Sequence, residues 1–453
     1  MKKIHPKKFL LWLGEQLEIW KEEEIITEEQ INKIKGKYNF FEVEQKGIPS
    51  KLIVSISTIG SLLIGSGIIL FIASNWEFIP KLSKIGIIFG MVFIVNHLGY
   101  YLRYTKANYP KIGSAILFLG SILFGGGIWL IAQVYNITSR YHNGILFWAL
   151  GIIPIAWLLG LETILSISSG LLSFWMVWKC TDFNVPNFPY LLLMVILILP
   201  LCYKEKAKVA LLLSLTGLSV WFGLGPCAAY LNKTEFLMTI CYLPLGIFIY
   251  SVGLLHSSIP KISSYQLFYK LQGSIILFLS IYVLSFKDSS QKVIMLLQKP
   301  LPILIPFFYI LITVLFFSFG VMLYAFLLYR HKNSSFSKVM NYEFFILCLF
   351  LFFLISIFTL KNIVFYGIFS NLILLIFSVG FIFGGYCYNK QPAFVNLGFI
   401  FFSIHFTTRY IDLGWKYLSR SVFFTIAGLL LLLGATFMER KRKKLIEEIK
   451  VSR

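Results

Sequence analysis

The 453-residue sequence has few charged residues, and acidic residues are especially scarce. Only 13% of its residues are Asp, Glu, Lys or Arg, about half the share of an average soluble protein, and 58% are hydrophobic. Such a chain cannot cover a water-facing surface with polar side chains, which excludes an ordinary soluble enzyme and a disordered tail. The net charge of +21 is expected at the bilayer edges of a membrane protein, so we expect no nucleic-acid partner.

Motifs for catalysis, cofactors and metals are also lacking. The six cysteines are scattered, with no CxxC pair and no spacing typical of a metal site. The sequence contains no P-loop, HExxH, GxSxG or dinucleotide-binding fingerprint. We therefore predict no catalytic residue, no cofactor and no metal site.

Long apolar runs are what the sequence does contain. A helix that crosses a bilayer needs about 20 mainly apolar residues, and this rule predicts an all-α polytopic membrane protein with about 14 (12–14) transmembrane helices. The predicted spans are 52–74, 85–102, 112–132, 145–160, 164–178, 190–202, 209–225, 236–254, 271–286, 302–329, 344–360, 365–388, 394–406 and 422–438. The predicted domains are a cytoplasmic helical hairpin (1–51), a repeat-containing membrane region (52–160), the remaining bundle (161–438) and a basic tail (439–453).

The distribution of Lys and Arg predicts the orientation. The excess of positive charge on one side comes from the two ends of the chain, which lie on the same side only if the number of spans is even. The run Arg440–Lys444 follows the last span directly and is typical of a cytoplasmic stop-transfer cluster. We therefore expect a multi-pass protein of the bacterial cytoplasmic membrane with both termini in the cytoplasm.

The N-terminal segment has the pattern of two short amphipathic helices. Leu10, Leu13, Leu17 and Trp20 recur at helical spacing, and Thr27 with Gln30 has the form of a capping box at the start of a second helix. The hairpin is either a small solvated element on the membrane face or a site of partner binding or self-association through residues 9–40. The lipid bilayer is the other expected partner, and the basic tail could lie on anionic headgroups.

An internal repeat is predicted between the first and third spans, which share the pattern G-S-x-L-x-G-x-G-I-x-L at an offset of 60 residues. Small residues four apart allow helix backbones to approach closely in lipid. They serve either packing alone or a helix that moves during transport. The small residues are Gly60, Ser61, Gly65 and Gly67 in the first copy and Gly120, Ser121, Gly125 and Gly127 in the second.

Polar and aromatic residues follow each copy of the repeat and are expected on the outer face. Amide, phenol, indole and guanidinium groups suit a sugar, a peptide or a lipid headgroup. However, Trp and Tyr also favour the interface for amphipathic reasons, and Asn or Gln can cap a helix end, so both interpretations stay open. The ligand-binding candidates are Asn75, Trp76, Gln133, Tyr135, Asn136, Arg140 and Trp148.

The same residues carry a resemblance to a known family. Trp20, the run Ile25–Gln30, the pair Asn75–Trp76 and the run Gln133–Asn136 resemble, in order and spacing, the bacterial predicted-membrane-protein family called "domain of unknown function 2157". The resemblance covers residues 10–160, about a third of the chain. It implies a bacterial cytoplasmic membrane protein and carries over no activity.

Ionisable and amide groups are rare inside the predicted spans. Asn96 and His97 are the intramembrane polar candidates, and His97 either hydrogen-bonds a neighbouring helix or relays protons. The eight acidic residues between 52 and 438 fall near span ends or in loops, which argues against cation coupling. We expect transport or flipping of an uncharged or lipid-linked substrate. The alternatives are a scaffold or sensor, with an outer ligand patch and a partner-binding hairpin, and a membrane enzyme acting on a lipid-linked substrate.

Overall fold

Helices make up all of the regular secondary structure that the computed structural model describes. The described residues are 16–17, 20–21, 23, 25–37, 50–74, 80–105, 109–137, 142–183, 185–227, 235–297, 301–330, 334–359, 363–388, 390–417, 419–429 and 433–451. No strand occurs within these ranges, which agrees with the predicted all-α class. The chain divides into two compact units, residues 1–137 and 138–453, which are described separately.

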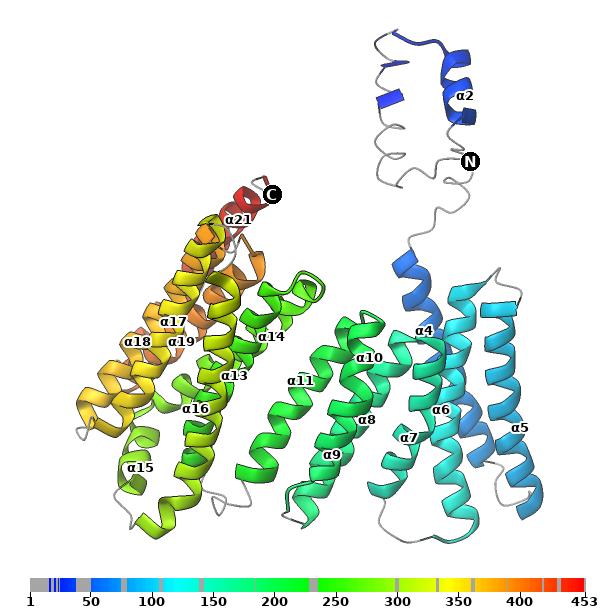
Figure 1. The fold of residues 1–453 in the computed structure, drawn as a ribbon, viewed down its shortest axis with the longest axis horizontal. Coiled ribbons are helices and arrows are strands. Elements are labelled where there is room, and N and C mark those ends of the chain that lie inside the picture. Colours follow the sequence, from blue (N-terminus) through cyan, green and yellow to red (C-terminus); the bar gives the residue numbers. More distant parts are fainter. Residues whose placement is uncertain are drawn as a thin grey trace. The chain divides into compact units, whose positions relative to one another are not determined.

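The predicted N-terminal hairpin falls at the start of the first unit, and most of its first helix lies outside the described residues. Residues 16, 17, 20 and 21 are helical, and α2 spans Glu28–Lys37 (Figure 1). The backbone N–H of Thr27 donates to Gln30 Oε1 at 2.9 Å, and that of Gln30 donates to Thr27 Oγ1 at 3.5 Å. These two bonds are the reciprocal contacts of a capping box, so the predicted helix start is confirmed.

Three long helices complete the first unit. They are α4 (Ser50–Ser74), α5 (Lys81–Tyr100), which continues into the π-helical segment η2 (Tyr101–Thr105), and α6 (Pro110–Val134). Both α4 and α5 pack on α6. A Cβ on Gly113 would lie 2.7 Å from the backbone N of Arg103 and 2.8 Å from the carbonyl O of Gly99. Glycine is thus required where α6 contacts the end of α5 and η2.

The second unit is a larger helical bundle in which sequential helices mostly pack on one another. The strongest contacts join α13 to α14 and α16, α7 to α8, α8 to α11, and α18 to α19. Its elements are α7 (His142–Leu159), α8 (Glu162–Phe183), α9 (Phe188–Leu193), η3 (Met194–Ile198), α10 (Leu199–Lys204), α11 (Lys208–Phe222), η4 (Gly223–Cys227), α13 (Glu235–Ser258), η5 (Ser263–Tyr265), α14 (Gln266–Leu284), α15 (Lys287–Leu297), α16 (Leu301–Arg330), α17 (Ser334–Thr359), α18 (Ile363–Phe383), η6 (Gly384–Tyr388), α19 (Pro392–Tyr417), α20 (Arg420–Leu429) and α21 (Ala435–Val451).

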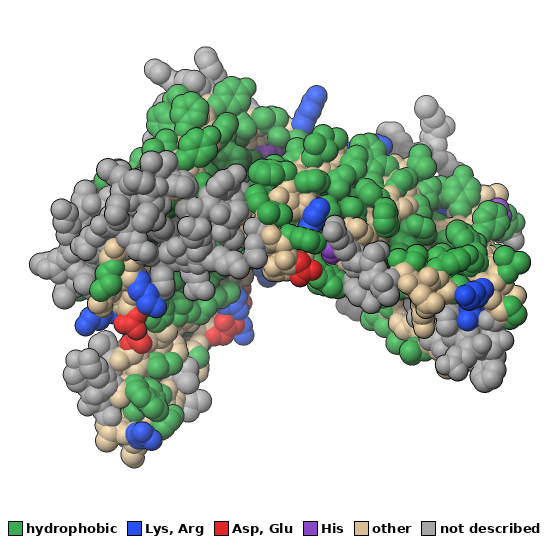
Figure 2. Space-filling view, turned by 90° about the horizontal axis from the view of Figure 1, so that it is seen from below, with side chains coloured by type: hydrophobic (Ala, Val, Ile, Leu, Met, Phe, Trp, Pro, Cys, Tyr) green, Lys and Arg blue, Asp and Glu red, His purple; other side chains and the backbone are tan. Residues whose placement is uncertain are grey.

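Nine helices are long and apolar enough to cross a membrane, counted over the described residues only. Four shorter apolar stretches add to them: Ile59–Ile68, Phe188–Lys204, Phe345–Ile357 and Arg420–Leu429. Hydrophobic side chains cover most of the described surface in Figure 2, and charged side chains form small separate groups. The protein is therefore a helical membrane protein with several spans, and the count of fourteen stays a prediction.

Candidate functional site

The end of α6 carries three of the predicted ligand-binding residues, and its geometry is that of a helix cap. Asn136 adopts a left-handed backbone with φ of 51°, and the N–H of Ile137 donates to the carbonyl of Ala132 at 2.8 Å. This six-to-one bond closes a Schellman motif, in which Asn is the usual substitute for glycine. Gln133, Tyr135 and Asn136 are all exposed. The cap accounts for Asn136 without a ligand, while the exposed Gln133 and Tyr135 remain free to contact one.

The other members of the predicted outer patch cannot be placed beside them. Asn75, Trp76 and Arg140 lie outside the described residues. Trp148 is half-buried in α7, which belongs to the second unit. The outer patch therefore stays a prediction.

The two intramembrane candidates of α5 face different surroundings. The Asn96 amide donates to the carbonyl of Val92 at 2.8 Å, and it lies against Gly120 of α6, where an added Cβ would be 2.6 Å away. His97 is exposed and stacks on Phe93, with ring centroids 5.9 Å apart. Asn96 is thus a packing contact between α5 and α6, and His97 lies on the surface of this unit.

The small residues of the predicted repeat have unequal environments in the two copies. A Cβ on Gly65 would lie 2.9 Å from Leu119 Cδ1, and one on Gly127 would lie 2.7 Å from Ile88 Cγ2. Ser61, Ser121 and Gly125 are buried. An added Cβ on Gly60 or Gly67 meets nothing within 4 Å. The close contacts support the packing role of these residues, whereas the repeat itself stays a prediction.

A buried ion pair in the second unit is the most unusual polar contact of the described chain. Lys270 Nζ of α14 donates to both carboxylate oxygens of Glu343 on α17, at 2.7 and 3.0 Å. The two side chains are only 6% and 2% exposed. Removing two charges from water costs several kcal/mol per ion, and only good geometry offsets that cost. Both carboxylate oxygens are used here, which is the favourable geometry.

Glycines at the contact between α13 and α14 leave space for the side chain of Lys270 in the Lys270–Glu343 pair. A Cβ on Gly253 would lie 2.7 Å from Lys270 Cγ, so the aliphatic stem of Lys270 runs across that glycine. Further along the same helix contact, Gly246 and Gly273 bring the backbones together, and a Cβ on Gly273 would lie 2.7 Å from the backbone N of Tyr250. Small residues at this contact therefore determine where the lysine lies.

A chain of aromatic hydrogen bonds lies beside Lys270. The Tyr203 hydroxyl of α10 is 2.6 Å from His256 Nε2 of α13 and 2.5 Å from the Tyr269 hydroxyl of α14. His256 and Tyr269 stack with ring centroids 4.5 Å apart. Because Tyr269 and Lys270 are adjacent in sequence, this Tyr203–His256–Tyr269 chain and the ion pair belong to the same end of α14.

The direction of these hydrogen bonds follows from one carbonyl. His256 Nδ1 is 2.7 Å from the carbonyl O of Val252, which can only accept, so Nδ1 carries a proton. In the neutral ring Nε2 then accepts from the Tyr203 hydroxyl. Tyr203 has no second proton to give, so Tyr269 donates to Tyr203. The chain is ordered from Tyr269 through Tyr203 to His256.

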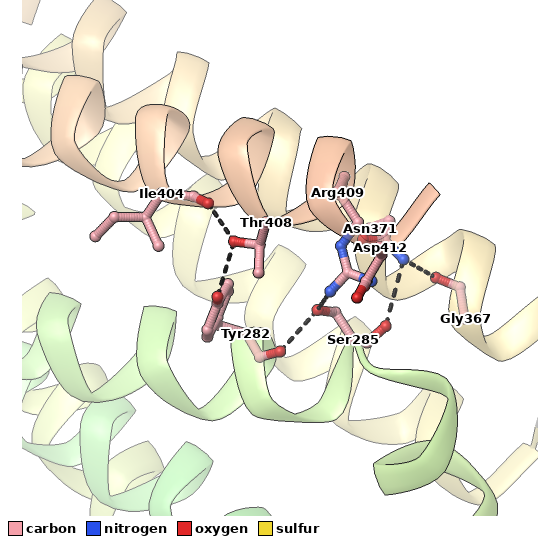
Figure 3. A network of polar contacts seen from close by, with 8 residues as sticks. All are labelled: Tyr282, Ser285, Gly367, Asn371, Ile404, Thr408, Arg409 and Asp412. Carbon is pink, nitrogen blue, oxygen red and sulfur yellow. Dashed lines mark hydrogen bonds and ion pairs between the residues drawn. The ribbon is translucent and has the colours of Figure 1, made fainter. Parts of the chain in front are cut away.

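The opposite end of α14 carries a second polar network, shown in Figure 3. Arg409 Nη2 of α19 donates to Ser285 Oγ at 2.7 Å, and Arg409 Nη1 donates to Asp412 at 2.9 Å. The Tyr282 and Thr408 hydroxyls are 2.8 Å apart. The Asn371 amide of α18 donates to the carbonyls of Gly367 at 2.7 Å and Ser285 at 3.4 Å. This Ser285 network joins α14, α18 and α19.

Metal binding has no support in the part of the chain that the structure describes. No three His, Cys, Asp or Glu side chains there are grouped closely enough to hold an ion.

The family comparison agrees with the predicted resemblance. Residues 18–165 match the family model described as "Predicted membrane protein (DUF2157)". The match covers the N-terminal third of the chain and ends in the first helices of the second unit. No curated protein and no solved structure matched the chain. The match to DUF2157 therefore supports a membrane protein. Lys270, Glu343 and Arg409 lie outside the matched region.

Sequence reasoning missed the main polar residues of the second unit. Hydropathy places Glu343 near a span end, and no motif singles out His256, Lys270 or Arg409. One signal in the sequence points to the ion pair. Lys270 stands directly before the apolar run 271–286, and Glu343, of opposite charge, stands directly before the run 344–360.

Proposed function

We propose that this protein transports or flips an uncharged or lipid-linked substrate across the bacterial cytoplasmic membrane, with both termini in the cytoplasm. The Lys270–Glu343 pair is the observation that carries the proposal. Buried charges within membrane segments commonly mark transport or proton pathways. Replacing a buried ion pair by apolar residues is often neutral or stabilising. Stability alone therefore does not account for this pair, whereas a protein that breaks and re-forms a contact between two conformations would use it.

The position of the pair supports a role in conformational change. It joins α14 to α17 at one end of α14, and the Ser285 network joins α14 to α18 and α19 at the other end. Lys270 and Ser285 are fifteen positions apart, which corresponds to about 22 Å along a helix. Polar contacts hold both ends of one helix, so releasing one end at a time would open the bundle on one side at a time.

The test uses a deletion strain whose lipid and envelope composition is compared with that of the parent by mass spectrometry. We expect a lipid-linked or uncharged envelope precursor to change in abundance and the wild-type gene to restore it. The double variant Lys270→Met/Glu343→Leu should be produced at normal levels, because it leaves no unpaired charge. It should restore transport at least about tenfold less, which corresponds to a transport barrier raised by about 1.4 kcal/mol.

The matched control is Lys261→Met, which removes an exposed lysine from the turn before α14 and should restore fully. Full restoration by the double variant would show that the ion pair is only structural. An unchanged composition in the deletion strain would contradict transport and favour the scaffold or sensor.

A further inference from the structure

An apolar groove lies between α19 and α20, on the side of α19 that faces away from the Ser285 network. Its volume is about 360 Å³. The Tyr410 hydroxyl donates to the carbonyl of Phe423 at 2.6 Å, and the two rings stack with centroids 5.2 Å apart, which fixes α20 against α19. The lining residues are Phe406, Thr407, Tyr410, Ile411, Trp415, Phe423, Phe424 and Ala427.

The walls of the groove are large apolar side chains that the described neighbours leave open. Trp415 is 57% exposed and Phe424 is 62% exposed. A large exposed apolar surface marks an interaction site. The molecules that surround a membrane-spanning bundle are lipids with hydrocarbon chains. An elongated hydrocarbon chain is the ligand that such a groove accommodates.

A positive charge lies beside Trp415, one of the residues that line the groove. The Arg420 guanidinium at the start of α20 lies 5.5 Å from the ring centroid of Trp415 and is exposed. Arg409, the nearest arginine along α19, points to the other side, where it is bound to Ser285 and Asp412. An apolar groove with an exposed cation beside one of its lining residues matches an amphiphile with an anionic head.

We propose that the α19–α20 groove binds an acyl chain of an anionic phospholipid whose phosphate contacts Arg420. Arginine holds phosphate oxygens through paired N–H donors, and basic pockets between membrane helices bind lipid headgroups in this manner. The lipid touches the same turns of α19 that hold Arg409, so its binding stabilises that part of the helix. The inference does not depend on transport and stands if the deletion strain shows no change.

The test measures thermal unfolding of the purified full-length protein in detergent, with added phosphatidylglycerol, phosphatidylcholine of the same chain length, or inorganic phosphate. Phosphatidylglycerol should raise the Tm by about 2 °C or more, phosphatidylcholine by less, and phosphate not at all. Arg420→Gln should reduce the phosphatidylglycerol effect to that of phosphatidylcholine, and Ala427→Trp, which fills the groove, should remove both effects. Lys261→Gln, which changes an exposed cation in the turn before α14, is the matched control and should behave as wild type.

Each opposite outcome overturns the proposal. Equal stabilisation of wild type and Arg420→Gln by phosphatidylglycerol would show that Arg420 holds no headgroup. Stabilisation by inorganic phosphate alone would assign a free anion. A wild-type dimer that Ala427→Trp converts to a monomer, without any lipid effect, would show that a second copy of the chain fills the groove. Because Arg420 is exposed, the Arg420→Gln variant should fold normally. It therefore tests the proposal even if Ala427→Trp fails to fold.

Discussion

Single glycines decide how closely the helices of this protein approach. At Gly113 an added Cβ would meet Cβ and the backbone N of Arg103 in η2 and the carbonyl O of Gly99 in α5, and none of these atoms can move unless the helix itself shifts. At Gly120 the nearest atoms are the end of the Asn96 amide, which can rotate. An added side chain is therefore tolerated differently at Gly113 and Gly120, because the atoms around Gly113 are fixed and those around Gly120 can rotate.

We expect Gly113→Ala to destabilise the protein by about 1–3 kcal/mol, because α5 and α6 must move apart. Gly90→Ala on α5 is the control, since an added Cβ there meets nothing within 4 Å. It should be neutral or stabilise the helix by up to about 1 kcal/mol. Denaturant or thermal unfolding in detergent measures both, and an equal loss of stability in the two variants would contradict the close-approach argument.

For single residues, the sequence shows which small residues share a helix face, but it does not show which residues of other helices they contact. The repeat pattern selected Gly65, Gly120 and Gly127, which do pack closely, but also Gly60 and Gly67, which meet no neighbour. It did not select Gly113. Periodicity shows which residues share a helix face, whereas the partner of that face depends on the tertiary arrangement. The ion pair was missed for the same reason, since its two residues are brought together only by the packing of α14 and α17.

The hydropathy pattern predicts where helices occur better than it predicts how long they are. Each of the fourteen predicted ranges overlaps a helix. The range 394–406 falls within α19, which runs from Pro392 to Tyr417. The apolar run stops at Thr407, but the helix continues because Arg409 and Asp412 pair with each other and Arg409 reaches Ser285. A hydropathy rule counts such residues as the end of a span, although their charges are satisfied.

The basic C-terminal helix α21 makes polar contacts with other helices of the bundle. Arg442 Nη1 of α21 donates to Asn396 Oδ1 of α19 at 2.6 Å, and the Tyr386 hydroxyl donates to Glu448 at 2.5 Å. Arg442 also donates two hydrogen bonds to Glu439, which lower the pKa of that carboxyl. The charged pair therefore persists at neutral pH and is lost only as the pH falls through that lowered pKa.

We predict that Asn396→Ala loosens α21, because Arg442 then loses its acceptor on α19. Limited trypsin digestion near pH 7 should cut the run Lys441–Lys444 several-fold faster in this variant than in wild type. Asn143→Ala, which changes an exposed residue of α7, should leave the rate unchanged. Unaltered cleavage of the Asn396→Ala protein would show that this contact does not hold the helix.

On the scale of the whole molecule, the orientation in the membrane determines what the two ends of α14 do. With both termini in the cytoplasm, the predicted order of spans puts Lys270 and Glu343 toward the cytoplasm and Arg409 toward the outside. Those positions follow from an even number of spans, which the basic cluster after the last span favours. The orientation cannot be read from the helices alone, because apolar length is the same in both directions.

Cysteine labelling tests this orientation. In a background with all six native cysteines replaced by Ala, Asp288→Cys should react with a membrane-impermeant maleimide in intact cells. Lys261→Cys, at the other end of α14, should react only after the membrane is permeabilised. Both residues are exposed. Labelling in the reverse order would invert the orientation, and labelling of both sites in intact cells would contradict the assignment of α14 as a span.

The ion pair also dictates an order of events during synthesis. Glu343 follows Lys270 by 73 residues, so at about 5–20 residues per second the ribosome needs about 4–15 s to supply the carboxylate. During that time α14 is in the membrane with an unneutralised lysine, whose burial costs about 3 kcal/mol on insertion scales. The nascent helix therefore has to keep the Lys270 ammonium near the headgroups until α17 arrives, and α14 reaches its final depth only after its partner has been made.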